Sequence, residues 1–197
     1  LDFDGVICDS IKECMLVSYY AYKNKLSYPI LDISIINPTL QKKFKKYRYL
    51  VGPAKNYYFL WKILLDKSGS NIEREYHSIK KNKAGMEKKF IERFYDLREE
   101  VRTKEFDKWV SFNPFYPKMN EFLNSTININ NLYIVTAKDA QSVFDLLHIN
   151  NIKINKKNIY SKEISLDKVE LFRRIIKKTR VSPTNIIYIE DKVSHIM

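Results

Sequence analysis

The chain has 197 residues, of which 45% are hydrophobic and 29% are charged. These values exclude an intrinsically disordered tail and are typical of a globular chain with a sizeable core. With 35 Lys and Arg against 23 Asp and Glu, the net charge is +12, so the surface is expected to attract anions. The basic residues are scattered and form no long block, so a nucleic-acid partner is not expected, whereas a small phosphorylated metabolite is.

No stretch of the sequence has the pattern of a signal peptide or the length of a membrane span. The two cysteines, Cys8 and Cys14, form neither a CxxC motif nor a zinc-spaced set. We therefore expect a cytoplasmic protein with reduced thiols and no contact with a membrane.

The opening residues, LDFDGVICDS, predict a strand that runs into a loop at Gly5. On a strand, residues i and i+2 point to the same side, so Asp2 and Asp4 would share a site. Two carboxylates held this close repel each other unless a cation or a proton intervenes. The pair therefore indicates a Mg²⁺ site or a nucleophile beside an acid, and the alternative is an acidic pair that caps a turn.

Residues 13–108 are expected to form a predominantly helical block. Apolar residues recur there at three- and four-residue spacing, which is the period of amphipathic helices. Helices are expected at 10–25, 39–51 and 57–65, and one long helix over most of 71–105.

Beyond Trp109, short apolar segments alternate with helical ones. Strands are expected at 132–135, 158–160 and 186–189, and helices at 119–123, 140–147 and 168–178. Alternation of this kind predicts a parallel sheet with right-handed crossovers. We therefore predict an α/β fold with a Rossmann-like parallel sheet core, formed by residues 1–12 and 109–197, into which residues 13–108 are inserted as an α-helical cap.

Both ends of the sequence lie close to the residues with candidate chemistry. The first carboxylate belongs to the second residue, whereas a buried strand normally has several apolar residues before such a turn. At the other end, the sequence stops six residues after Asp191. We therefore expect a chain that is truncated at both ends.

Polar residues follow the expected strands. Thr136 comes directly after 132–135, and Glu190 and Asp191 come directly after 186–189. In open parallel sheets, ligands bind beyond the carboxyl ends of the strands, so these residues are expected near Asp2 and Asp4. Polar residues at the end of one strand are explained more simply by a turn. Here they follow three predicted strands, and together they indicate a site.

The opening motif resembles DxDGxxxDS, the first motif of the haloacid dehalogenase-like hydrolases, in the branch of phosphoglycolate phosphatase and β-phosphoglucomutase. The segment LYIVT is similar to the second motif of that family, and IIYIEDKVSH is similar to the fourth. Lys168, 23 residues before Asp191, matches the third motif, and Lys162 is the alternative. His195 stands where the family often has a further Asp.

This resemblance implies a role for four residues in phosphoryl transfer. Asp2 would attack the phosphoryl group and form an aspartyl-phosphate, and Asp4 would act as acid and base. Thr136 and Lys168 would stabilise charge on the phosphoryl oxygens.

The resemblance also implies a metal and further substrate contacts. Mg²⁺ would be held by Asp2, Asp4 and Asp191, with Glu190 behind them. Ala137 would contact the substrate beside Thr136 and Lys168. Arg48, in the cap, is a candidate selector of substrate, and the alternative is a solvated helix residue.

The expected function is a Mg²⁺-dependent phosphatase that hydrolyses a small phosphomonoester. Asp4 argues against dehalogenation, because true dehalogenases of the family lack this second Asp. Two alternatives stay open: a sugar-phosphate mutase of the same fold, and a non-catalytic, basic protein associated with nucleic acid.

Overall fold

The structure is a computed structural model that describes residues 1–24, 31–66, 71–82, 87–125 and 131–192. The chain divides into two compact units. Unit 1 comprises Leu1–Ser10 and Asn113–Met197, and unit 2 comprises Ile11–Phe112. The boundaries therefore fall after residues 10 and 112, where the sequence had suggested 12 and 108.

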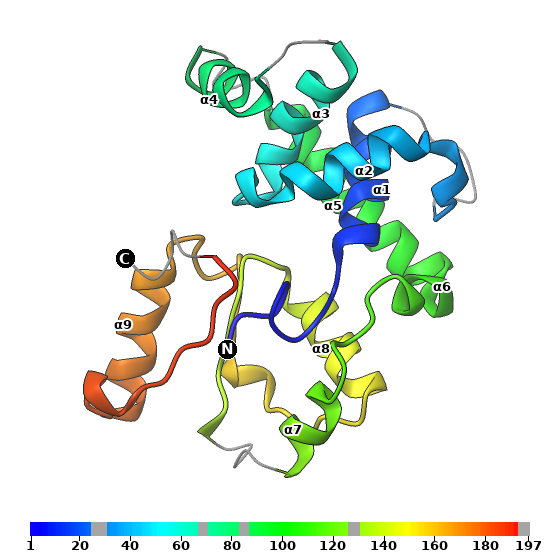
Figure 1. Ribbon diagram of the computed structural model, residues 1–197. Coiled ribbons are helices and arrows are strands. Elements are labelled where there is room, and N and C mark those ends of the chain that lie inside the picture. Colours follow the sequence, from blue (N-terminus) through cyan, green and yellow to red (C-terminus); the bar gives the residue numbers. More distant parts are fainter. Residues whose placement is uncertain (25–30, 67–70, 83–86, 126–130, 193–197) are drawn as a thin grey trace. The chain divides into compact units, whose positions relative to one another are not determined.

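Unit 2 is helical throughout its described residues (Figure 1). Its α-helices are α1 (Ile11–Lys23), α2 (Pro38–Tyr47), α3 (Tyr57–Asp66), α4 (Ile72–Asn82), α5 (Lys88–Lys104) and α6 (Phe106–Ser111), with 3-10 helices η1 (Ile33–Ile35), η2 (Arg48–Leu50) and η3 (Ala54–Asn56). The first three α-helices lie where the periodicity predicts them. The prediction of a single long helix over 71–105 is wrong, because α4 ends at Asn82 and α5 begins at Lys88. Residues 83–86 lie outside the described residues.

The core of unit 2 is aromatic. Phe44 of α2 stacks on Tyr57 and Trp61 of α3, with ring centroids 5.6 and 4.9 Å away, and Tyr57 stacks on Phe94 of α5 at 5.9 Å. All four side chains are buried. Aromatic contacts of this kind add to the stabilisation from buried area, so these rings hold the helices together.

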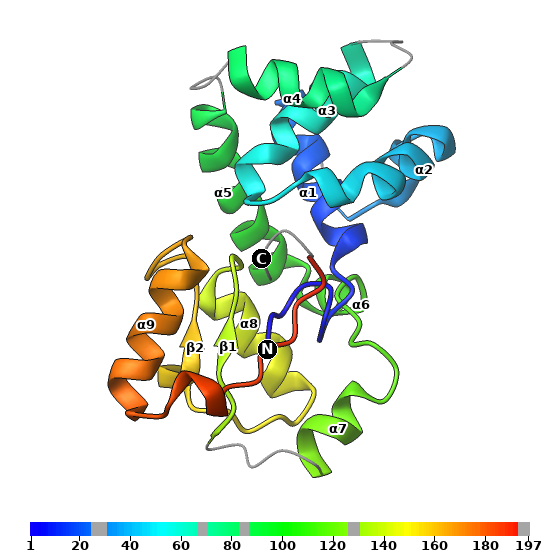
Figure 2. The same cartoon turned by 60° about the vertical axis from the view of Figure 1, so that its left-hand side comes forward.

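A buried ion pair joins α1 to α5, which lie side by side in both views (Figures 1 and 2). Arg98 donates two hydrogen bonds to Glu13, at 2.7 and 2.8 Å, and contacts the ring of Phe94. Because Glu13 is fully buried, its charge depends on this partner.

Unit 1 contains a small parallel sheet between two helices. Figure 2 shows β1 (Ile134–Val135) and β2 (Ile159–Tyr160) with α8 (Ala140–Ile149) on one side and α9 (Lys168–Thr179) on the other. Ile134 pairs with Ile159, and Val135 pairs with Tyr160. The other helical elements are α7 (Met119–Ser125) and the 3-10 helices η5 (Lys156–Asn158) and η6 (Pro183–Asn185).

The predicted Rossmann-like parallel sheet core is wrong. Among the described residues there are nine α-helices and a sheet of only two strands. The opening residues do lie beside β1, and 186–189 lie beside the opening residues: Val135 N–H donates to Leu1 O and Asp2 N–H donates to Ile189 O, each at 2.9 Å. These contacts are too few to make strands, because the chain bends at Phe3, whose carbonyl accepts from the N–H groups of Ile7 and Cys8.

Two sequence expectations concern the chain as a whole. Within the described ranges, no helix has both the length and the apolar character that crossing a bilayer requires. Cys8 and Cys14 are both buried, and neither forms a disulfide.

Candidate functional site

The chain turns sharply directly after Asp2, and this turn requires Gly5. Gly5 has a φ of +92°, a backbone conformation that residues with a Cβ rarely adopt. A Cβ added there would lie 2.2 Å from Oδ2 of Asp191. The glycine therefore allows the Asp191 carboxylate to lie directly against the opening loop.

Asp2 and Asp4 are not on one continuous strand, in contrast to the sequence expectation. Asp2 continues the extended segment that begins at Leu1, whereas Asp4 follows the bend and forms an isolated bridge with Cys8. Both carboxylates are nonetheless held in unit 1, each by its own lysine.

Lys168 binds Asp2. The Lys168 ammonium lies 2.8 Å from Asp2 Oδ2, and the backbone N–H of Phe3 donates to Asp2 Oδ1 at 2.8 Å. Lys168 is the first residue of α9, which Asp167 caps by accepting from the N–H of Val169. This cap fixes the helix start and therefore the origin of the lysine side chain.

Lys162, the alternative to Lys168, has a different partner. Its ammonium lies 3.2 Å from Glu163 Oε1, and that carboxylate also accepts from Ser161 and from the N–H of Ala140. The structure thus brings Lys168, and not Lys162, to Asp2.

Lys168 also binds Glu190 and Tyr188. Its ammonium donates to Glu190 Oε2 and lies 3.0 Å from the Tyr188 hydroxyl, which in turn donates to Glu190 Oε2 at 2.9 Å. Glu190, expected behind the metal ligands, therefore shares the lysine directly with Asp2. Tyr188 was not predicted; its place two residues before Glu190 on an extended segment was the available signal.

The pKa values of Asp2 and Glu190 are shifted in opposite directions. Burial raises the pKa of Asp2 to about 7, although Lys168 opposes this shift. Burial also acts on Glu190, but the hydrogen bond from Lys168 is among the interactions that hold the pKa of Glu190 well below its usual range. Burial and the neighbouring carboxylates raise the pKa of Tyr188 above its usual range, so its hydroxyl stays protonated.

Three carboxylates form a group that could hold a cation. One oxygen each of Asp2, Glu190 and Asp191 lie within 4.8 Å of one another. Oxygen donors of this type suit Mg²⁺, so the residues fit the expected metal in kind. The group differs from the predicted ligand set in that Glu190 takes the place of Asp4.

Asp4 is bound by a lysine that the sequence did not indicate. The ammonium of Lys138 lies 3.2 Å from Asp4 Oδ1, and Lys138 is only 2% exposed. The backbone N–H of Lys138 donates to Thr136 Oγ1 at 3.1 Å, and Thr136 is itself joined to β2 through Tyr160. The available signal was position: Lys138 follows Thr136 by two residues, on the loop after β1.

The other residues predicted from the sequence are Ala137, Arg48 and His195. Ala137 lies between Thr136 and Lys138 on the same loop. Arg48 belongs to unit 2, where it donates to the carbonyl of Val51 at 2.9 Å and lies over the ring of Tyr57. His195 is outside the described residues.

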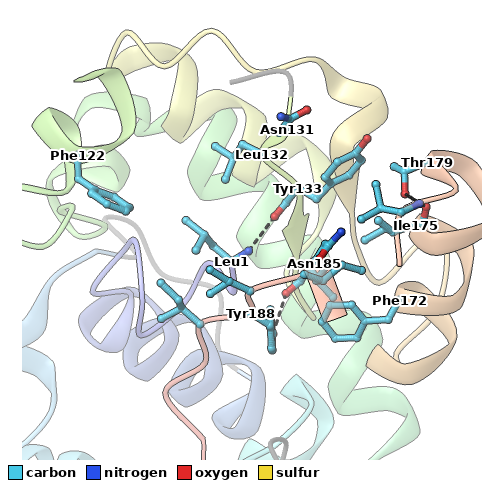
Figure 3. Close-up of a pocket in the computed structure, with 15 residues that line it drawn as sticks. Leu1, Phe122, Asn131, Leu132, Tyr133, Phe172, Ile175, Thr179, Asn185 and Tyr188 are labelled. Atoms are coloured by element: carbon cyan, nitrogen blue, oxygen red, sulfur yellow. Dashed lines mark hydrogen bonds between the residues drawn. The ribbon is translucent and has the colours of Figure 1, made fainter. Parts of the chain in front are cut away.

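Unit 1 also has an apolar cavity of about 740 Å³, shown in Figure 3. Side chains that include Phe122, Tyr133, Phe172 and Ile175 line it, and Leu1 donates to the Tyr133 carbonyl at its wall. None of the predicted site residues and no Lys or Arg is among its lining residues. It therefore lacks the cations that a phosphate group would need.

Comparisons of the chain with protein-family models, with curated proteins and with solved structures give no match. The chemistry of the site is therefore inferred from its contacts: a buried aspartate bound by Lys168, a second aspartate bound by Lys138, and an acidic group beside them.

Proposed function

We propose that the protein is a Mg²⁺-dependent phosphatase that hydrolyses a small phosphomonoester through an aspartyl-phosphate on Asp2. The observation that carries this proposal is the pairing of two aspartates with two lysines, Lys168 with Asp2 at 2.8 Å and Lys138 with Asp4 at 3.2 Å. Phosphoryl transfer needs a nucleophile, an acid that later acts as a base, and cations near the phosphoryl oxygens. The cluster offers a residue for each of these roles.

In the first step, a carboxylate oxygen of Asp2 attacks the phosphorus atom. The bond from phosphorus to the ester oxygen breaks, its electron pair leaves with that oxygen, and protonated Asp4 donates a proton to form the free alcohol. Lys168, already bound to Asp2, stabilises the negative charge at the point of attack. The Thr136 hydroxyl accepts from the N–H of Lys138 and donates its own hydrogen to a phosphoryl oxygen.

In the second step, Asp4, now a carboxylate, accepts a proton from water as the water oxygen attacks phosphorus. The bond between phosphorus and Asp2 breaks, and its electron pair returns to the Asp2 carboxylate. Inorganic phosphate leaves, and Asp4 is protonated again, so the cycle closes without any other reactant.

Asp2, Glu190 and Asp191 would hold the Mg²⁺ ion through carboxylate oxygens. When bound, the ion offsets the repulsion between the Asp2 carboxylate and the phosphate dianion. Lys168 also offsets this repulsion, because its ammonium contacts both Asp2 and Glu190.

The test is hydrolysis of p-nitrophenyl phosphate and of a panel of small phosphorylated metabolites, with Mg²⁺ and with EDTA. We expect metal-dependent turnover in the wild type and its loss in Asp2→Asn. Asp107→Asn, an exposed carboxylate-to-amide change on α6, is the matched control and should turn over like the wild type. No turnover by the folded wild type on any substrate would contradict the proposal, as would full activity in Asp2→Asn.

A further inference from the structure

The two lysines of the cluster differ in exposure. The side chain of Lys168 is 15% exposed, whereas that of Lys138 is fully buried. The Asp4 side chain that Lys138 binds is 22% exposed. A substrate can therefore reach the Asp4 carboxylate but not the Lys138 ammonium.

The loop that carries Lys138 is held at several points. The N–H of Lys138 donates to Thr136 Oγ1, and the Lys138 carbonyl accepts from the N–H of Lys162. The next residue, Asp139, caps α8 by accepting from the N–H of Ser142 at 2.8 Å. The ammonium therefore projects from a backbone with a defined position, as a group that orients a catalytic side chain requires.

We infer that Lys138 is a positioning residue that acts through Asp4, an inference that rests on the proposed function. Its ammonium lies 3.2 Å from Oδ1 of Asp4 and so constrains the orientation of that carboxyl group. With its orientation fixed, the Asp4 carboxyl group is ready to donate a proton to the ester oxygen in the first step and to accept one from water in the second. No contact between Lys138 and the substrate is needed.

A simpler role is possible for the same contact. A buried ammonium requires a counter-charge, and the Lys138–Asp4 pair also ties the loop after β1 to the opening loop. A purely structural pair would lower the activity toward all phosphate esters to the same extent. A positioning role predicts a loss that depends on the leaving group, because an alkyl alcohol needs a proton from Asp4 and p-nitrophenol hardly does.

The experiment compares an alkyl phosphate with p-nitrophenyl phosphate, using the full chain of wild type, Lys138→Met, Asp4→Asn and the double variant. For Lys138→Met we expect kcat to fall about 100-fold on the alkyl ester and about 10-fold or less on the aryl ester, within the range for acid–base catalysis. KM should change little on either ester. Lys138→Arg, which keeps the charge, should retain more of the alkyl activity, and Lys162→Met is the control that should match the wild type.

The double variant tests whether Lys138 acts through Asp4. We expect Lys138→Met to cause little further loss once Asp4 is Asn, because the two residues then act as one unit. Equal losses on the two esters, or losses that multiply in the double variant, would overturn the inference and leave the phosphatase proposal intact. A wild type without turnover on either ester would instead overturn both.

Thermal unfolding of each variant shows whether it is folded. If Lys138→Met does not fold, Lys138→Arg carries the comparison, because it changes the geometry of the bond to Asp4 while the buried charge remains. A leaving-group dependence in Lys138→Arg would support the inference, and its absence would overturn it.

Discussion

Each unit of the molecule buries cations against carboxylates, but in different proportions. In unit 2, Arg98 binds Glu13 through two hydrogen bonds, one cation for one carboxylate. In unit 1, the two lysines Lys138 and Lys168 lie among four carboxylates, those of Asp2, Asp4, Glu190 and Asp191. The first pair is balanced in charge, whereas the second cluster has more carboxylates than cations.

This difference separates a structural pair from a site. A balanced buried pair has little to gain from a further ligand, and its loss exposes one uncompensated charge. A cluster with excess carboxylates is stabilised by protons or by a cation. Burial, with a smaller contribution from Glu190, raises the pKa of Asp2 to about 7. We therefore expect changes in unit 2 to alter stability and changes in the cluster to alter chemistry.

The largest effect on stability is expected for Arg98→Met. It leaves Glu13 buried without its partner, so the free energy of unfolding should fall by about 3–5 kcal/mol. Turnover per folded molecule should be unchanged. Urea denaturation followed by tryptophan fluorescence measures the loss, and the double variant Glu13→Leu/Arg98→Met should regain most of it. A folded Arg98→Met protein with wild-type stability would contradict the assignment of this pair as structural.

Lys168→Met should reduce kcat by about 100- to 1,000-fold, the usual cost of losing one group that stabilises developing charge. Its effect on the free energy of unfolding should be smaller than that of Arg98→Met, because Asp2 can take up a proton. Steady-state kinetics and urea denaturation of the same preparation check both parts. Lys162→Met, in which a partly exposed pair with Glu163 is lost, is the control. Equal activity of Lys168→Met and Lys162→Met would contradict the assignment of Lys168 to the site.

Gly5→Ala should destabilise the protein by about 1–3 kcal/mol, because φ is positive and a Cβ would meet Asp191. Displacement of that carboxylate should also weaken Mg²⁺ binding, measured by calorimetry. Gly52→Ala, whose Cβ would meet only the end of the Asn56 side chain at 3.5 Å, should leave Mg²⁺ binding unchanged. Unchanged Mg²⁺ affinity in Gly5→Ala would argue against Asp191 as a ligand.

A further prediction concerns the dependence of stability on pH. The pKa of Asp2 is raised from 3.8 to about 7, so its stabilising contribution is complete below 3.8 and is lost as the pH rises through 7. Glu190 has the opposite shift, and its contribution is lost only as the pH falls below its usual range. In EDTA, the free energy of unfolding of the wild type should therefore fall between pH 5 and 7 relative to that of Asp2→Asn. Parallel pH profiles for the two proteins would contradict this electrostatic account.

The sequence predicted the helices of this fold better than its sheet. Apolar periodicity is local, so α1, α3, α8 and α9 lie close to the predicted segments. Strands require a partner backbone, which periodicity does not report. The segment 186–189 is apolar and extended, yet its backbone contact with Asp2 is a single hydrogen bond from the Asp2 N–H to Ile189 O.

The candidate site was predictable where spacing along the chain mattered and not where burial decided the contact. The resemblance to the third and fourth motifs of a known family, matched by the 23-residue interval between Lys168 and Asp191, indicated the lysine that the structure places at Asp2. Lys138 was missed although it follows Thr136 by two residues, because many surface lysines lie in loops and only the fold shows that this one is buried. The sequence did not indicate that Glu190 binds Lys168. That contact forms because the start of α9 brings Lys168 to Glu190, which also accepts from the Tyr188 hydroxyl.

In the proposed mechanism, Asp2 is the nucleophile. This role is tested by a rapid acid quench of the wild type with Mg²⁺ and p-nitrophenyl phosphate, followed by mass spectrometry of the intact chain and of its peptides. We expect one added phosphoryl group on the peptide that contains Asp2, sensitive to hydroxylamine and missing in Asp2→Asn. Turnover with no such adduct in the wild type, together with continued turnover in Asp2→Asn, would contradict the claim.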